Sequence, residues 1–139
     1  MTALLTIVLL PVMLVVLATT LELGALRIVA ARAHSAADLA ALVAVNDQDD
    51  AELAETGRLR PSSDAADVAR AVFADNLKSI EGSLAAAPAA IAAGAAVNIE
   101  SAPATVRIST SVPVRTPVFG ALFFHPVTAV AIRTAGGAR

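Results

Sequence analysis

The chain has 139 residues, of which 57% are hydrophobic and only 3% aromatic, and its formal net charge is −2. This apolar composition excludes a disordered tail, and the lack of a basic excess argues against an electrostatic nucleic-acid binder. Because the chain has no cysteine, disulfide scaffolds, thiolate metal sites and cysteine nucleophiles are excluded as well.

The hydrophobic excess is concentrated at the N-terminal end. Residues 1–21 contain no charged side chain, and four threonines are their only polar residues. About 20 apolar residues span the hydrocarbon core of a bilayer as a helix, and membrane helices tolerate an internal proline such as Pro11. A cleaved secretory signal would begin with basic residues, and the core helix of a soluble domain would show a polar face. The segment therefore predicts a spanning helix, or a helix buried in an assembly with similar demands.

The helical pattern continues beyond Leu21. Residues 22–46 are rich in alanine and leucine and contain no proline, which favours a helix. We expect one helix over residues 3–46, about 65 Å long at 1.5 Å per residue. Because this length is about twice the thickness of a membrane core, the second half has to pack against something other than lipid.

A stripe of small residues recurs in this second half at spacings of three and four: Ala30, Ala33, Ala37, Ala41 and Ala44. Such stripes let helix backbones approach one another closely. Two interpretations stay open at this stage. The stripe packs against neighbouring copies of the chain, or it reflects a general bias toward alanine.

Glu22 places a carboxylate at the end of the apolar run. A carboxylate at this position is costly unless it is solvated or paired. Arg27 and Arg32 follow five and ten residues later, off the spacings that favour pairing within a helix. We therefore expect either headgroup water or a cationic group of another copy to satisfy Glu22.

A polar connector is expected from Asn46 to Ser63. Its acidic residues suggest calcium, but an EF-hand loop beginning at Asp47 would need glycine at its sixth position and glutamate at its twelfth. Those positions hold Glu52 and Arg58, so a calcium loop is not favoured.

Residues 64–86 predict a second helix, because large apolar residues recur there at helical spacing. Gly82 weakens its last turns and Pro88 ends it. The alanine-rich stretch 85–96 is compatible with a loop or with a short extra turn. The predicted apolar stripe consists of Ala69, Val72, Phe73, Leu77, Ile80 and Leu84.

The pattern then changes to strict alternation, which is typical of half-buried strands. Strands are predicted around residues 97–100, 106–115 and 127–134. Between the last two lies a segment that we expect to form an irregular surface arm, and it carries Phe119, Phe123 and Phe124.

The predicted fold class is therefore α+β, a long N-terminal helix followed by a small head. We expect a membrane or filament-core helix over residues 1–26, an amphipathic continuation over 27–47 that packs on the head, and the head itself over 48–139. The head is predicted to contain one further helix and a roughly three-stranded antiparallel sheet.

Catalytic and cofactor motifs are not found in the sequence. His34 and His125 are the two histidines, and two isolated histidines without cysteine or paired carboxylates do not make a zinc site. There is no G-x-S-x-G motif, phosphate-binding glycine loop or dinucleotide fingerprint. We expect no enzymatic activity, cofactor, metal, nucleic-acid partner or small-molecule substrate.

An ordered set of features in residues 3–45 resembles the TadE/TadG-like pilins and pseudopilins of tight-adherence (Flp-type) pili. The set comprises Pro11 within an apolar run, Glu22-Leu23-Gly24, Arg27 with Ala31-Arg32, and the stretch 36–42, AADLAAL. Such proteins usually carry a basic leader and a glutamate soon after its cleavage point, where this chain has Leu5 and Thr6. The numbering then begins at a processed N-terminus, or the chain departs from the family pattern.

The resemblance implies a structural subunit that waits in the inner membrane as a single-pass protein and is then extracted into a helical filament on the cell surface. It implies copies of itself and the pilus assembly platform as partners, and a role in adhesion. The alternative is a minor pseudopilin or a membrane-anchored accessory module that does not form the shaft. The residues expected at the subunit interface are Leu5, Val8, Leu9, Val12, Val15, Val16, Glu22, Ala30, Ala33, Ala37 and Ala41, with Phe119, Phe123 and Phe124 on a possible surface arm.

Overall fold

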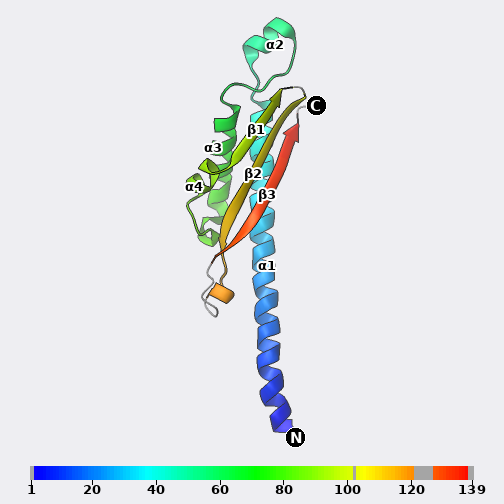
Figure 1. Ribbon diagram of the computed structural model, residues 1–139, viewed down its shortest axis with the longest axis vertical. Coiled ribbons are helices and arrows are strands. Elements are labelled where there is room, and N and C mark those ends of the chain that lie inside the picture. The colour runs from blue at the N-terminus through cyan, green and yellow to red at the C-terminus, as the bar shows by residue number, and fades with distance from the viewer. Residues whose placement is uncertain (1, 102, 121–126, 138–139) are drawn as a thin grey trace.

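The protein is a helical rod with a small head along its second half (Figure 1). The computed structural model describes residues 2–101, 103–120 and 127–137, and it describes the side chains of the first helix from Ile7 onward. The elements in chain order are α1 (Thr2–Asn46), α2 (Asp50–Thr56), α3 (Ala65–Leu77), the 3-10 turn η1 (Lys78–Ser83), α4 (Pro88–Ala93), β1 (Ala96–Ser101), β2 (Ala104–Arg115) and β3 (Val127–Gly137). The predicted α+β class is confirmed.

Helix α1 runs without interruption for 45 residues, through Pro11. Two of its threonines return their hydroxyls to the preceding turn: Thr19 Oγ1 donates to the carbonyl of Val15 and Thr20 Oγ1 to that of Val16, both at 2.8 Å. These bonds satisfy the hydroxyls inside the helix. The long helix expected from the sequence is therefore confirmed.

The three strands form one antiparallel sheet in the order β1-β2-β3. The central strand β2 alternates as its sequence predicts, except at Thr110, which is only half-buried: Val106, Ile108, Val112 and Val114 are buried, whereas Arg107, Ser111 and Arg115 are exposed. Helices α1 and α3 pack against the buried face (Figure 1). The core therefore lies between this face and the two helices.

The head approaches α1 very closely. A Cβ atom built on Gly136 of β3 would lie 2.8 Å from the backbone carbon and oxygen of Ala41, a separation that side chains do not reach. Nearby, the Thr134 hydroxyl and the Asp38 carboxylate form a hydrogen bond between β3 and α1. Small residues are thus required on both elements, because the two backbones are almost in contact.

Gly136→Val should destabilise the head by about 1–3 kcal/mol or more, since the added side chain has to push β3 off α1. The same exchange at Gly137, where a Cβ meets nothing within 4 Å, is the control. Hydrogen exchange of the β2 and β3 amides in the detergent-solubilised full-length chain measures the effect. Equal exchange rates in the two variants would contradict the close approach.

Two local features differ from the sequence-based expectations, and a third decides between two alternatives that the sequence left open. The connector contains the short helix α2, which Asp49 caps by accepting hydrogen bonds from the N–H groups of Ala51 and Glu52, at 3.0 and 3.2 Å. Its acidic residues therefore start a helix. The helix predicted over 64–86 ends at Leu77 and continues as the tighter turn η1, and the ambiguous stretch 85–96 contains α4.

Candidate functional site

The first half of α1 is an apolar rod exposed on all sides. Every large aliphatic side chain from Ile7 to Leu17 is more than half exposed, and α1 is the one helix among the described residues that is long and apolar enough to cross a membrane. Five of the predicted interface residues lie here, namely Val8, Leu9, Val12, Val15 and Val16. The side chain of Leu5 lies outside the described part of the chain.

The second half of α1 also keeps large aliphatic side chains on its outer face, away from the head. Ile28 is 58% exposed, and Leu39 and Leu42 are each 48% exposed. At 100° per residue, Leu39 and Leu42 lie within about 40° of Ile28 around the helix axis. We call this set, together with Val43, the outer stripe. It continues the apolar rod along the head and is interrupted by exposed Arg32 and Ser35.

The alanine stripe faces in the opposite direction, into the chain's own head. Ala33, Ala37 and Ala41 have no exposed surface, and Ala30 is partly exposed. Their partners are α3 and the strands of the same chain. The interpretation that this stripe contacts neighbouring copies is therefore wrong for these three buried residues, because the head already occupies the space above them.

The outer stripe was not among the interface residues expected from the sequence, although the spacing of its large side chains indicates it. Leu39, Leu42 and Val43 lie on the side of α1 away from the small residues. A head that docks through a small-residue face leaves the larger side chains of the helix facing outward.

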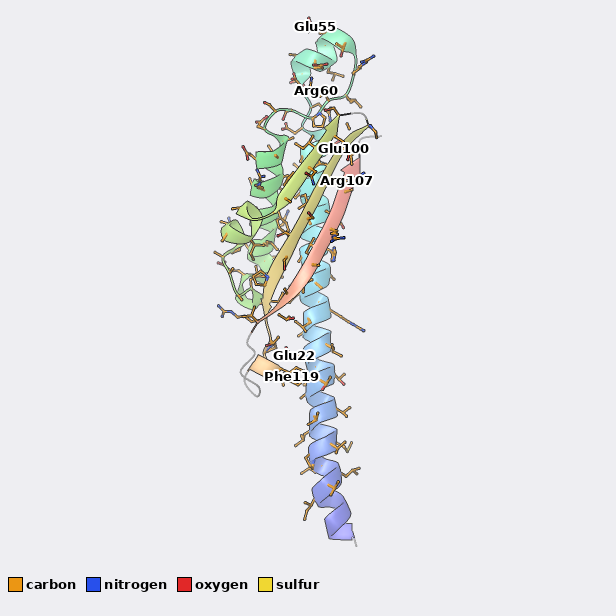
Figure 2. All side chains as sticks on the ribbon, viewed as in Figure 1. Glu22, Glu55, Arg60, Glu100, Arg107 and Phe119 are labelled. Atoms are coloured by element: carbon orange, nitrogen blue, oxygen red, sulfur yellow. The ribbon has the colours of Figure 1, made fainter. Side chains whose placement is uncertain are left out.

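Glu22 forms the junction between the rod and the head. Only 1% of its surface is exposed, and its Oε2 atom accepts hydrogen bonds from the backbone N–H groups of Val118, at 2.8 Å, and Phe119, at 3.3 Å. Figure 2 shows Glu22 and Phe119 side by side below the main body of the head. The expected partners, headgroup water or a cation of another copy, are replaced by the backbone of the chain's own arm.

The two N–H groups bound by Glu22 open a short turn, residues 116–120, in which the Gly120 N–H donates to the Thr116 carbonyl at 3.0 Å. A carboxylate is well placed there, since N–H groups at the start of a helical turn lack partners of their own. The other carboxylate oxygen, Oε1, is buried without a hydrogen-bond partner among the described residues. Of the two carboxylate oxygens, Oε2 is therefore the one that holds the two amides of the turn on α1.

Glu22→Ala should speed hydrogen exchange at the Val118 and Phe119 amides by roughly 10- to 100-fold, because hydrogen bonds to a charged group contribute about 1.5–3 kcal/mol each. Glu22→Gln, which keeps an acceptor oxygen, should restore part of the protection. Glu55→Ala on exposed α2 is the control and should leave both amides unchanged. Equal protection in the Glu22→Ala variant and the wild type would exclude a holding role for Glu22.

The remaining predicted residues contribute less to the site. Phe119 is half-buried in the turn, whereas Phe123, Phe124 and His125 lie outside the described residues. His34 is half-buried on α1. Among the described residues, no group of three histidine, aspartate or glutamate side chains lies close enough to hold a metal ion.

Comparison with known proteins identifies the N-terminal third of the chain. Residues 1–47 match the family model described as "Putative Flp pilus-assembly TadE/G-like", whereas no curated protein and no solved structure matches the chain. The matched segment coincides with α1, which carries the apolar rod, Glu22 and the outer stripe. The resemblance seen in the sequence is thereby confirmed: residues 1–47 of this chain are similar to the TadE/G-like proteins of Flp pilus assembly.

Proposed function

We propose that the protein is a structural subunit of an extracellular Flp-type pilus and that it polymerises through α1. It waits in the inner membrane as a single-pass protein, and the assembly platform then extracts it into a helical filament that serves surface adhesion. The family match over α1 supports a role in pilus assembly, and the exposed surface of α1 supports the polymerisation step.

One observation carries the proposal: the exposed apolar surface of α1 is longer than a membrane can cover. The charge-free stretch up to Leu21 already accounts for one bilayer core. Leu39 lies 18 residues further along, about 27 Å at the helical rise, and is still 48% exposed. A membrane anchor needs no apolar surface at that height, whereas a neighbouring subunit in a bundle of helices would cover it.

Once the subunit has left the membrane, the energetics of burial favour such a bundle over a rod exposed to water. The rod would remove well over about 1,000 Å² of apolar surface from water, worth tens of kcal/mol before ordering costs at about 25 cal/mol per Å². Leaving lipid is feasible if equivalent apolar surface on neighbouring copies replaces it. The exposed surface ion pairs of the head, such as Arg60 with Glu52 at 3.4 Å, contribute at most about 1 kcal/mol each and cannot drive assembly.

The geometry of the subunit fits an open polymer. The head covers one side of the second half of α1, and the outer stripe lies on the other side. We expect the outer stripe of one copy to contact the apolar rod of the next copy, so that each contact joins two different surfaces. Contacts of this kind generate helical filaments when the rotation does not close a ring.

Surface filaments sheared from cells and imaged by negative stain with an antibody against the head test the proposal. We expect the chain along the whole filament shaft. Its confinement to the membrane fraction would overturn the proposal in favour of a membrane-anchored accessory module, and its restriction to isolated points on filaments would indicate a minor subunit.

A further inference from the structure

The Glu22 junction lies at the height where the apolar span ends. The helix has no charged residue before Glu22, and the 20 residues Thr2–Leu21 cover about 30 Å, the thickness of a hydrocarbon core. The Val118 and Phe119 amides are 2.8 and 3.3 Å from the Glu22 carboxylate. The turn over residues 116–120 is therefore fixed at the same height along the rod as this boundary (Figure 2).

The chain around this turn is apolar. Between Arg115 and Arg133 there is no aspartate, glutamate, lysine or arginine. At the same end of the head, Val127 is 49% exposed at the start of β3. Val127 also lines, with Pro117 of the turn and Leu26 of α1, an apolar cavity of about 600 Å³. The opposite end of the head has a different character, since α2 and its flanks carry exposed acidic and basic residues.

Basic side chains flank the turn on both segments that Glu22 connects. Arg115 is exposed immediately before the turn, and Arg27 is the first charged residue after Glu22 on α1 and is also exposed. An apolar turn flanked by arginines suits the layer between acyl chains and phosphates, where long basic side chains reach the headgroups.

We propose that the turn over residues 116–120, held on α1 by Glu22, rests in the headgroup layer of the bilayer that α1 spans. The occupant of this surface is thus the lipid interface, before extraction of the subunit. The inference rests on the membrane-anchored state of the proposed function and is independent of polymerisation. Glu22 acts here as a positioning residue, because it sets the height of the turn and contacts its backbone.

The chain contains no tryptophan or tyrosine, so a single introduced tryptophan reports one position. Phe119→Trp places the probe in the turn, and Val127→Trp places a second probe at an exposed neighbouring position. Leu9→Trp marks the middle of the span, and Leu59→Trp marks the exposed far end of the head. Each full-length variant is reconstituted in phosphatidylcholine vesicles whose acyl chains carry bromine, a contact quencher, either near the headgroup or near the chain end.

We expect the tryptophan emission of the Phe119→Trp and Val127→Trp proteins to be blue-shifted relative to that of the Leu59→Trp protein. Their fluorescence should be quenched more strongly when bromine lies near the headgroup than when it lies near the chain end. Leu9→Trp should be quenched more by bromine near the chain end, and Leu59→Trp should be insensitive to both. Adding Glu22→Ala to the Val127→Trp protein tests the positioning role, and we expect reduced quenching there.

The possible failures are distinguishable. If Leu9→Trp is quenched while the Phe119→Trp and Val127→Trp proteins behave like Leu59→Trp, the inference is overturned and the membrane anchor stands. If Leu9→Trp is not quenched, the membrane-anchored state itself fails, and the inference fails with it. A third outcome is that the emission of the Phe119→Trp and Val127→Trp proteins is blue-shifted but is not quenched by either brominated lipid. Protein rather than lipid would then cover the turn, and the inference would be overturned in favour of a second copy.

Discussion

Cells that produce the Leu9→Asp variant should form no filaments. Leu9 lies in the middle of the charge-free span and is 51% exposed in the single chain. An aspartate at the centre of a membrane helix costs about 2.5–3.5 kcal/mol at the insertion stage. In a bundle of helices the same carboxylate would be buried without a partner, which costs several kcal/mol more per copy. Because every subunit carries the charge, the loss should be complete.

The head should remain folded in this variant, since Leu9 precedes by 20 residues the first core residue on α1, Val29. The matched control is the same exchange at Leu59, which is 45% exposed in the connector far from the rod. Negative-stain imaging of sheared material measures the filaments, and hydrogen exchange of β2 in detergent measures the head. If the Leu9→Asp strain gave the wild-type yield of filaments, the proposal that the subunits polymerise through the rod would be wrong.

Two substitutions on neighbouring positions of α1 should have opposite consequences. Ala37→Asp introduces a carboxylate at a site with no exposed surface, and an uncompensated buried charge typically costs about 3–5 kcal/mol. A small head has a total stability of only about 5–15 kcal/mol, so this variant should lose a large part of its stability. Leu39→Asp, on the outer stripe, should leave the head folded and the protein in the membrane, yet reduce filament yield strongly.

Urea unfolding of the detergent-solubilised full-length proteins, monitored by hydrogen exchange, measures the stability of the head. The amount of protein in the sheared surface fraction measures the filament yield. Leu39→Ala serves as the milder control, because it shortens the outer stripe without adding charge. Normal filaments from the Leu39→Asp strain would show that the outer stripe does not contact a neighbouring copy. A stably folded Ala37→Asp head would contradict the packing of the alanine stripe against α3 and the sheet.

The predictability of the elements follows from the range of the interactions that determine them. Helix α1 and strand β2 are recognisable because their patterns extend over many residues, with periods of 3.6 and 2. Helix α2 was missed because its seven residues depend on one capping aspartate rather than on an apolar stripe. The change from α3 to η1 at Leu77 brings Leu84 into an antiparallel bridge with Val114, a contact that connects distant parts of the chain.

The amino-acid sequence by itself determined that this protein has a charge-free helix of membrane length, that the helix continues well beyond it, and that a small α+β head follows. These properties depend on composition and periodicity, which are local. The tertiary structure alone decided which face of α1 meets the head and which partner Glu22 has. The alanine face is buried because Gly136 lets β3 touch the helix backbone, and the Oε2 atom of Glu22 accepts hydrogen bonds from amides 96 and 97 residues away. Both outcomes depend on contacts between segments far apart in the chain, which no spacing along the helix encodes.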